Sequence, residues 1–456
     1  MSSRFLIFRI SNFSCQKKHE NNNVSDCYMH IKHLHFLEHI EIPELTECEW
    51  NYPCPSLPAV EDELLRQISI SSLAARIKPG DRIAVTAGSR GISRIDTILA
   101  VICKEVKRLG AHPFIISAMG SHGGATEEGQ REILNGYNIT PERIGAPVVC
   151  ATTVVEIGRT PDGMPVFFDE EALKADGLIV VNRIKSHTSF QSATESGILK
   201  MLAVGLGKDR GARHIHQLGT RGLKQGIPQA ARIIMDTVPV LLGIGILENA
   251  RGSIAVIEAL EPEQIEAAEE QLLKQAKALM PVIPFNNVDV LIVTEMGKNI
   301  SGTGMDTTVI GRRMISGEPE PSCPRIARIA VLDLSPGSYG NATGLGLADI
   351  ITRQLYDKID FAKTWLNIIS STFIERAKIP ITMPTDKTAI QLALMTCWVA
   401  QPGTARVVLI KNTGSLGRLY ISKPLAAEAR QVAHLHCAER FVPPAFTMQH
   451  ALENYF

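Results

Sequence analysis

Basic side chains and histidines gather in four polar, glycine-bearing loops of this 456-residue chain. Histidine gives or takes a proton near neutral pH, and arginine binds a carboxylate through two parallel hydrogen bonds. Such a mixture is suited to holding a small anion and moving its protons. The loops therefore predict an acid–base site for a carboxylate or phosphate. The residues concerned are Arg90, His122, Lys185, His187, Lys200, His214, His216 and Lys298.

Each histidine also has an ordinary structural interpretation. His122 is flanked by glycines and followed by Thr126 and two glutamates, the pattern of a helix entrance with a threonine cap and acids in the first turn. His187 could be a hydrogen-bonded loop histidine, and His214 or His216 could line a helix. Residue types alone leave both interpretations open.

The loops follow apolar stretches with strand character. One pair of such stretches is separated by a segment with helical spacing at 95–109, which is the rhythm of βαβ units with parallel strands. In open sheets of this kind ligands gather at the carboxyl ends of the strands. We therefore predict an α/β fold of two domains with mostly parallel sheets and an active site in the cleft between them. The predicted strands are 82–86, 113–117, 177–181, 240–244, 288–293, 329–333 and 406–410.

The domain boundary is predicted after a charged, alanine-rich helix at 261–279, which is followed by Pro281 and Pro284. This places an N-terminal domain at 29–283 and a C-terminal domain at 284–456. Residues 1–28 are rich in Ser, Asn and Lys without a period, so we expect a disordered leader or a misassigned start.

Composition excludes several classes of protein. Lys+Arg 47 balances Asp+Glu 47, so no basic excess is present to neutralise a nucleic acid backbone. No apolar run reaches the roughly 20 residues of a membrane helix. The nine cysteines are scattered without a C-x-x-C pair, which argues against a disulfide framework or a zinc knuckle. We expect a reducing, cytoplasmic setting and neither nucleic acid nor membrane as a partner.

Common cofactor signatures are missing from the glycine-rich loops. The stretch 205–211 matches neither the P-loop nor the G-x-G-x-x-G pattern, which disfavours a Walker ATPase and an ordinary Rossmann dehydrogenase. The stretch 335–346 follows a predicted strand and is expected to precede a helix. It could cradle a phosphate, although a plain surface turn is the favoured interpretation.

Taken in chain order, these loops resemble those of the nickel-dependent lactate racemase family, which uses a nickel pincer nucleotide on 2-hydroxy acids. Gly-Ser-His122-Gly-Gly-Ala-Thr resembles the loop of the family's first catalytic histidine, and Asn-Arg-Ile-Lys-Ser-His187 resembles that of the second. Lys200 falls where the family's lysine carries the pincer ring through a thioamide. His216 has the spacing of the nickel ligand, with His214 as the alternative.

The resemblance implies further roles. Arg90 and Lys298 would hold the substrate carboxylate and polarise the forming carbonyl, while Lys185, Ser121 and Gly205 would contact the cofactor. Hydride would move from the substrate carbon to the pincer ring and return to the other face. His122 and His187 would have symmetric tasks as the two bases. The implied partners are a small 2-hydroxy acid and the proteins that synthesise the pincer and insert nickel.

The sequence also departs from the family pattern. Ala87 stands where the family's D-x-x-R loop has its aspartate, and the segment between His187 and Lys200 is longer than expected. Its approach to the lysine reads Thr194-Glu-Ser-Gly197, and we expect Glu195 to add a charge to the pocket. These departures leave the substrate's side chain open.

Three other functions remain open from the sequence. The chain could be a non-catalytic anion-binding relative that never receives the cofactor. It could be a cofactor-free lyase or isomerase using His122 and His187 as acid and base. A nicotinamide dehydrogenase is the weakest alternative, because its fingerprint is missing.

Overall fold

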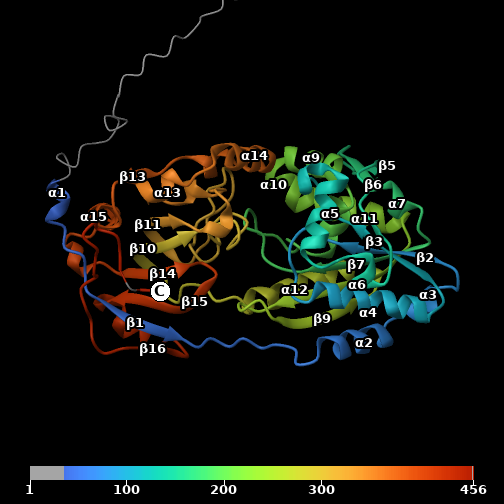
Figure 1. Ribbon diagram of the computed structural model, residues 1–456, viewed down its shortest axis with the longest axis horizontal. Helices are drawn as coiled ribbons and strands as arrows, with labels where there is room; N and C mark the ends of the chain where they lie inside the picture. The colour runs from blue at the N-terminus through green and yellow to red at the C-terminus, as the bar shows by residue number, and fades with distance from the viewer. Residues whose placement is uncertain (1–34, 454) are drawn as a thin grey trace, which may run out of the picture.

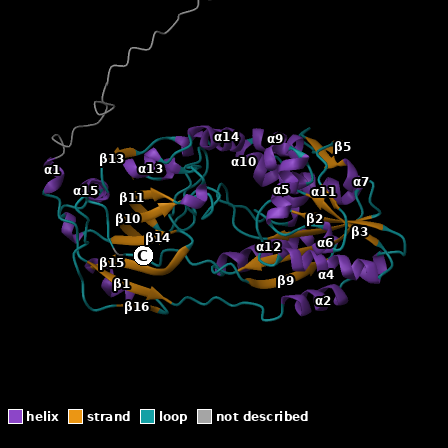
Figure 2. Ribbon diagram, viewed as in Figure 1, coloured by secondary structure: helices purple, strands orange, loops and turns teal. Residues whose placement is uncertain are grey.

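The computed structural model describes residues 35–453 and 455–456, which form two lobes lying side by side (Figure 1). The predicted leader at 1–28 lies outside the described residues. Each lobe is organised around one large β-sheet, and helices pack against the strands (Figure 2). The predicted α/β class with mostly parallel sheets is confirmed.

The first sheet has six strands in the order β4-β3-β2-β7-β8-β9. All neighbours are parallel except β8 and β9. The strands are β2 (Arg82–Ala87), β3 (His112–Ser117), β4 (Val148–Val149), β7 (Gly177–Arg183), β8 (Val240–Glu248) and β9 (Ile254–Leu260). A separate hairpin joins β5 (Val154–Arg159) to β6 (Pro165–Asp169).

Helices cover this sheet because their apolar residues recur every three or four positions. In α4 (Ile95–Arg108) the buried positions include Ile98, Leu99, Ile102 and Val106, which form one stripe facing the strands. The other helices of this lobe are α2 (Val60–Ile70), α3 (Leu73–Arg76), α5 (Glu127–Gly136), α6 (Pro141–Ile144), α7 (Glu170–Leu173), α8 (Ile198–Lys200), α9 (Lys208–Gln217), α10 (Gly219–Arg221), α11 (Ile227–Thr237) and α12 (Ile265–Ala278).

The second sheet has eight strands in the order β13-β12-β11-β10-β14-β15-β1-β16. The run from β13 to β14 is parallel, and the remaining pairings are antiparallel. The strands are β1 (Leu45–Trp50), β10 (Asn287–Met296), β11 (Arg325–Leu334), β12 (Ile350–Thr352), β13 (Ile381–Met383), β14 (Val407–Asn412), β15 (Ser415–Ser422) and β16 (Leu435–Cys437). The helices of this lobe are α1 (His35–Glu38), α13 (Arg353–Asp357), α14 (Phe361–Ser371), α15 (Asp386–Thr396) and α16 (Ala426–Ala429).

The position of β1 corrects the predicted division of the chain. Residues 45–50 were expected in the first domain, but they pair with β15 and β16 in the second sheet. The chain then crosses to the first lobe, where α2 follows (Figure 1). Strand pairing is decided by which partner buries the strand, and the sequence neighbourhood of β1 contains no partner.

The same pairing corrects the expectation about cysteines. Cys48 of β1 lies opposite Cys437 of β16, and the two form a disulfide with their Cα atoms 3.9 Å apart. They are 389 residues apart in sequence, so spacing gave no sign of the bond. Cys54, Cys103, Cys150, Cys323 and Cys397 are free.

Two further sequence expectations can be compared with the structure. The seven predicted strands are present as β2, β3, β7, β8, β10, β11 and β14. The stretch 335–346 does follow β11. It forms 3-10 turns at Pro336–Ser338 and Leu345–Leu347 and leads first into the short strand β12, so the next helix, α13, begins only at Arg353. Among the described residues, every helix is too short or too polar to cross a bilayer.

Candidate active site

The polar loops meet because both sheets reverse their strand order near the middle. In the first sheet β3 lies on one side of β2 and β7 on the other, so the loops that leave β2 and β7 diverge. They contain Arg90 and His187, and the loop after β3 contains His122. In the second sheet β10 is the reversal point, between β11 and β14, and its loop contains Lys298. Such switch points are where α/β sheets bind ligands.

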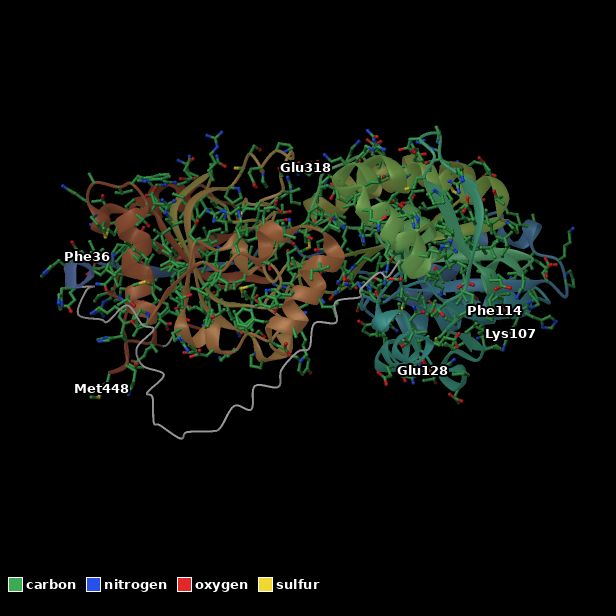
Figure 3. All side chains as sticks on the ribbon, turned by 90° about the horizontal axis from the view of Figure 1, so that it is seen from above. Phe36, Lys107, Phe114, Glu128, Glu318 and Met448 are labelled. Carbon is green, nitrogen blue, oxygen red and sulfur yellow. A yellow bond between two sulfur atoms is a disulfide. The ribbon has the colours of Figure 1, made fainter. Side chains whose placement is uncertain are left out.

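The loops of the two lobes contact each other directly. Thr307 donates its hydroxyl proton to the carbonyl oxygen of Thr188 at 3.0 Å. Lys224 pairs with Glu318 at 2.5 Å, and Figure 3 labels Glu318 where the two lobes meet. A Cβ atom placed on Gly302 of the second lobe would lie 4.0 Å from the Arg90 guanidinium. The two switch points therefore face one another.

His122 lies in a strongly basic environment. Burial is the largest cause that lowers the pKa of His122, to about 3, and the positive charges of Arg90, Lys200, Lys298 and His216 lower it further. His122 and Arg90 nevertheless keep solvent contact. Because the His122 side chain is exposed, solvent weakens the effect of burial, and the neighbouring cations account for much of the lowered pKa.

Ser89 holds the His122 ring. Its hydroxyl makes a short hydrogen bond with Nδ1 of His122, and its carbonyl oxygen accepts a hydrogen bond of 3.1 Å from the Tyr137 hydroxyl. A serine hydroxyl can rotate and either donate or accept. The Nδ1 atom of His122 can therefore carry a proton or lack one without losing its partner.

His187 is held by backbone groups instead. Ser189 donates its backbone N–H to Nδ1 of His187 at 3.1 Å, and the ring of Phe190 lies 4.6 Å from the imidazole, centroid to centroid. Burial lowers the pKa of His187 well below its ordinary value, and nearby cations, Lys200 foremost, add to this effect. The imidazole is therefore neutral at neutral pH.

Glu195 does not add a charge to the pocket as expected. The residue is only 3% exposed, and its carboxylate accepts the backbone N–H of His187 at 2.6 Å. Lys277 pairs with the same carboxylate at 2.6 Å. Within the segment between His187 and Lys200, Glu195 thus bonds back to the start of the segment and fixes the backbone of the His187 loop.

Lys200 stands on a short helix whose start is tightly defined. Glu269 from α12 accepts the backbone N–H of Leu199 at 3.0 Å, and Asn182 donates to the carbonyl oxygen of Gly197 at 2.7 Å. A Cβ atom on Gly197 would lie 2.5 Å from the Glu269 carboxyl carbon, so a side chain at this position would displace the Glu269 carboxyl group. Burial, and then the charge of Arg90, lower the pKa of Lys200 to about 8.

The helical segment after Lys200 turns back on itself. A π-helical stretch at Met201–Gly205 is followed by Lys208, whose φ of 51° is left-handed and ends the first helical run. The bend lets His216, near the end of α9, reach the basic cluster, where burial and then the charge of Lys200 lower its pKa to about 4. His214 lies apart, with Nδ1 bonded to the carbonyl oxygen of Arg210 and its ring beside Phe167.

Close packing joins this segment to the His122 loop. Gly120 donates its N–H to the carbonyl oxygen of Gly205 at 3.1 Å, and a Cβ on Gly205 would lie 2.9 Å from the Ala118 carbonyl oxygen. Ser121 lies in the same loop as His122. Beneath the loop, Lys208 is buried in an ion pair of 2.9 Å with Asp169. The glycine-rich stretch thus brings two helical runs against β3.

Two more predicted lysines complete the cluster. Lys185 has its pKa lowered to about 7 by burial and then by Arg183 and Arg90, although its side chain keeps solvent contact. Lys298 has its pKa lowered to about 8 by burial and then by Arg90. Ser338 accepts the backbone N–H of Lys298 at 2.8 Å, so the stretch 335–346 positions the Lys298 loop.

Three charged residues around the site were missed by sequence reasoning. Glu248 at the end of β8 pairs with Arg183 and accepts the backbone N–H of Ser93, which ties the Arg90 loop to β8. Asp306 is a carboxylate near Lys185. Arg376 of the second lobe binds the loop after His187. Their positions after strands or in turns were visible, but their partners are distant in sequence.

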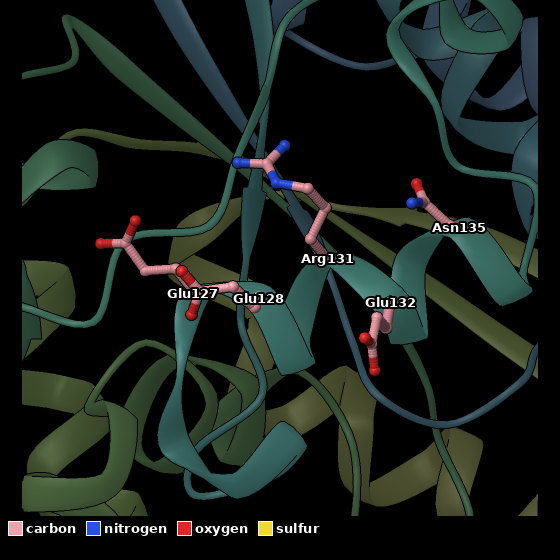
Figure 4. A pocket seen from close by; sticks show the side chains of 5 residues that line it. All are labelled: Glu127, Glu128, Arg131, Glu132 and Asn135. Atoms are coloured by element: carbon pink, nitrogen blue, oxygen red, sulfur yellow. The ribbon is translucent and has the colours of Figure 1, made fainter.

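The structural interpretation of the residues after His122 is also confirmed. Thr126 caps α5 by accepting the N–H of Gly129 at 3.1 Å, and glutamates occupy the first turn. The exposed side chains of α5 line a hollow that contains none of the predicted site residues (Figure 4). Its lining residues are Glu127, Glu128, Arg131, Glu132 and Asn135.

A comparison with curated proteins found no match. Among solved structures, the lactate racemase apoprotein from Thermoanaerobacterium thermosaccharolyticum matches with a TM-score of 0.42 and 12% identity, over 75% of this chain and 94% of that one. The assignment rests instead on the family model of the lactate racemase N-terminal domain, which matches residues 39–225. Residues 39–225 therefore belong to the lactate racemase N-terminal domain family.

Proposed function

We propose that this protein is a racemase or epimerase of a 2-hydroxy acid that works with a nickel pincer nucleotide tethered to Lys200. The observation that carries the proposal is the single basic cluster at the junction of the lobes. The cluster consists of His122, His187, Lys200 and His216 of the first lobe and Lys298 of the second lobe. The family match over residues 39–225 supports it.

The residues present fit the proposed cofactor. Lys200 supplies an amine whose pKa of about 8 leaves part of it uncharged, as a covalent bond to an acyl-type carbon requires. His216 supplies a neutral imidazole, a common ligand for nickel. Among the described residues no group of three or more His, Cys, Asp or Glu could hold a metal ion. The remaining donors would come from the tethered group, which when bound supplies the hydride acceptor.

The chain's own residues handle the anion and the proton. Arg90 offers a forked donor to the substrate carboxylate, and Lys298 adds a second cation from the other lobe. The hydroxyl proton moves to an imidazole, for which His122 is placed. The cations around His122 keep it neutral with a free lone pair, and a bound carboxylate would offset their charge and so make the imidazole a stronger base. A cluster with this excess of positive charge favours an anionic substrate.

The first experiment is intact-protein mass spectrometry with nickel analysis, on protein made together with a pincer-synthesising system. We expect one added nucleotide mass that peptide mapping places on Lys200, with nearly one nickel per chain. His216→Ala should lose nickel, and His214→Ala, two residues away on the other side of α9, should retain it.

Loaded protein should then interconvert the enantiomers of at least one member of a panel of 2-hydroxy acids. An unmodified, nickel-free chain would contradict the proposal. Turnover by chelator-treated protein made without the pincer system would instead establish a cofactor-free acid–base enzyme.

A further inference from the structure

We infer that Arg376 of the second lobe is a positioning residue that, through Ser189, fixes the orientation and tautomer of His187. The contacts that carry this inference stand on their own. Its catalytic consequence rests on the proposed function.

Arg376 is buried at 2% exposure in the turn after α14, and it reaches across the junction. Its Nη2 donates to the carbonyl oxygen of Thr188 at 2.7 Å and its Nη1 to the hydroxyl of Ser189 at 3.0 Å. Its Nε donates to the carbonyl oxygen of Arg313 at 3.0 Å. All three acceptors are uncharged.

A buried guanidinium bound only by neutral acceptors is costly to desolvate. Burial accordingly lowers the pKa of Arg376 to about 10. In return, the rigid, planar guanidinium of Arg376 binds two consecutive residues in a fixed geometry. Those residues, Thr188 and Ser189, directly follow His187. Thr307, also of the second lobe, bonds the same Thr188 carbonyl oxygen at 3.0 Å.

Ser189, held by Arg376, in turn orients the imidazole of His187 through a hydrogen bond of fixed direction. The backbone N–H of Ser189 lies 3.1 Å from Nδ1 of His187. A backbone N–H can only donate, so Nδ1 must be the acceptor, and the single proton of the neutral ring must be on Nε2. The tilted ring of Phe190 packs against the imidazole, and the Glu195 carboxylate accepts the backbone N–H of His187. Little freedom is left for a different tautomer.

This arrangement distinguishes the two histidines, for which the resemblance implied symmetric tasks. His122 faces the reversible hydroxyl of Ser89 and can present a lone pair or a proton. His187 presents Nε2–H while Arg376 holds Ser189 in place. An imidazolium would carry a proton on Nδ1 as well, so proton uptake by His187 and the Ser189 contact exclude each other. The second lobe thereby sets which histidine offers the lone pair.

The test uses full-length, cofactor-free protein labelled with ¹⁵N at histidine, in which long-range ¹H–¹⁵N correlations distinguish the two tautomers. His187→Gln identifies the His187 signals. In the wild-type protein we expect an unprotonated Nδ1 and a protonated Nε2. In Arg376→Gln the Nδ1 signal should move toward the protonated position, and Arg376→Lys, which can reach one acceptor, should lie between the two.

The matched control is Arg312→Gln. Arg312 also lies in the second lobe, but it bonds the carbonyl oxygen of Leu347 at 2.9 Å and Asp349 at 2.8 Å within that lobe. It should leave the His187 signals unchanged. Ser189→Ala retains the N–H and loses one Arg376 contact, so it should give a smaller shift than Arg376→Gln and serves as the test if that variant does not fold.

A wild-type His187 with its proton on Nδ1 would overturn the inference, as would unchanged His187 signals in folded Arg376→Gln or, if that variant does not fold, in Ser189→Ala. The measurement needs no cofactor, so a failure to load Lys200 would refute the proposed function and leave this inference standing. In loaded protein, Arg376→Gln should lower kcat by about 10- to 100-fold with the Lys200 adduct intact.

Discussion

Arg90 is a side chain of the first lobe that also lies close to the second lobe. It follows β2 of the first lobe and lies close to Gly302 of the second. It also contributes to the lowered pKa of His122, Lys185, Lys200 and Lys298. A guanidinium with so many cationic neighbours gains most when an anion binds between them, because the anion relieves their mutual repulsion.

Arg90→Ala should therefore raise KM for the hydroxy acid by roughly 10- to 100-fold, since a hydrogen bond to a charged group is worth about 1.5 to 3 kcal/mol. Steady-state kinetics measures this change, and the mass of the Lys200 adduct should remain. Arg94→Ala is the control, because Arg94 in the same loop pairs with Glu61 at the surface. Loss of the adduct in Arg90→Ala would place Arg90 at the cofactor instead.

His122→Ala and His187→Ala should each lower the racemisation of both enantiomers by about 100- to 10,000-fold, the usual contribution of a positioned acid or base. Polarimetry or chiral chromatography from each pure enantiomer measures the rates. His214→Ala should keep wild-type rates, because its ring lies beside Phe167. Full activity in either of the first two variants would exclude the two-histidine site.

At the scale of elements, the short helix α8 depends on a buried acid. Glu269 is 1% exposed and lies at the start of α8, where it accepts the Leu199 N–H. Burial is the largest effect on its pKa, which rises to about 7 even though the backbone hydrogen bonds oppose the rise. The start of α8, the helix that carries Lys200, is therefore held by the Glu269 carboxyl group, which titrates near neutral pH.

This predicts a specific pH dependence of stability. A carboxyl whose pKa is higher in the folded state than its ordinary 4.5 holds its proton more tightly when folded. Its stabilising contribution is complete below pH 4.5 and is lost as pH rises through about 7, by at most about 3 kcal/mol. Glu269→Gln should remove this decline, as measured by Tm between pH 4.5 and 8.

The neighbouring Glu270→Gln is the control for that experiment, because Glu270 pairs with Lys274 on the surface of the same helix. It should keep the wild-type slope. An unchanged slope in Glu269→Gln would show that another group causes the decline.

At the scale of the whole molecule, the chain crosses between the lobes more than once. Strand β1 lies in the second sheet before α2 begins the first lobe, and β10 returns to the second sheet after α12 (Figure 1). The disulfide of Cys48 with Cys437 anchors β1 beside β16. This bond closes a loop that contains the entire first lobe.

Cys437→Ser should therefore lower the free energy of unfolding of the second lobe by about 2 to 5 kcal/mol, because a cross-link over a long loop restricts the unfolded chain. Calorimetry measures the change, and a reductant should lower the Tm of the wild-type protein but not that of the variant. Cys54→Ser, which removes a free thiol, should match the wild-type protein. Equal stability of Cys437→Ser would mean that the strand pairing alone holds β1.

The local features of the molecule could be predicted from the order of its residues. Apolar stretches at 82–86 and 113–117 and the helical spacing of 95–109 identified β2, β3 and α4, because period and burial are properties of neighbouring residues. The polar loops at strand ends likewise indicated where His122 and His187 would lie.

The pairing of distant segments became visible only in the folded chain. Strand β1 pairs with β16. His216 lies in the basic cluster and His214 lies outside it. Glu195 bonds the backbone of His187 instead of adding a charge to the pocket. The fold also brings Arg376 to Ser189. These outcomes depend on packing between residues far apart in the chain, where burial and hydrogen-bond satisfaction choose among partners that local pattern cannot rank.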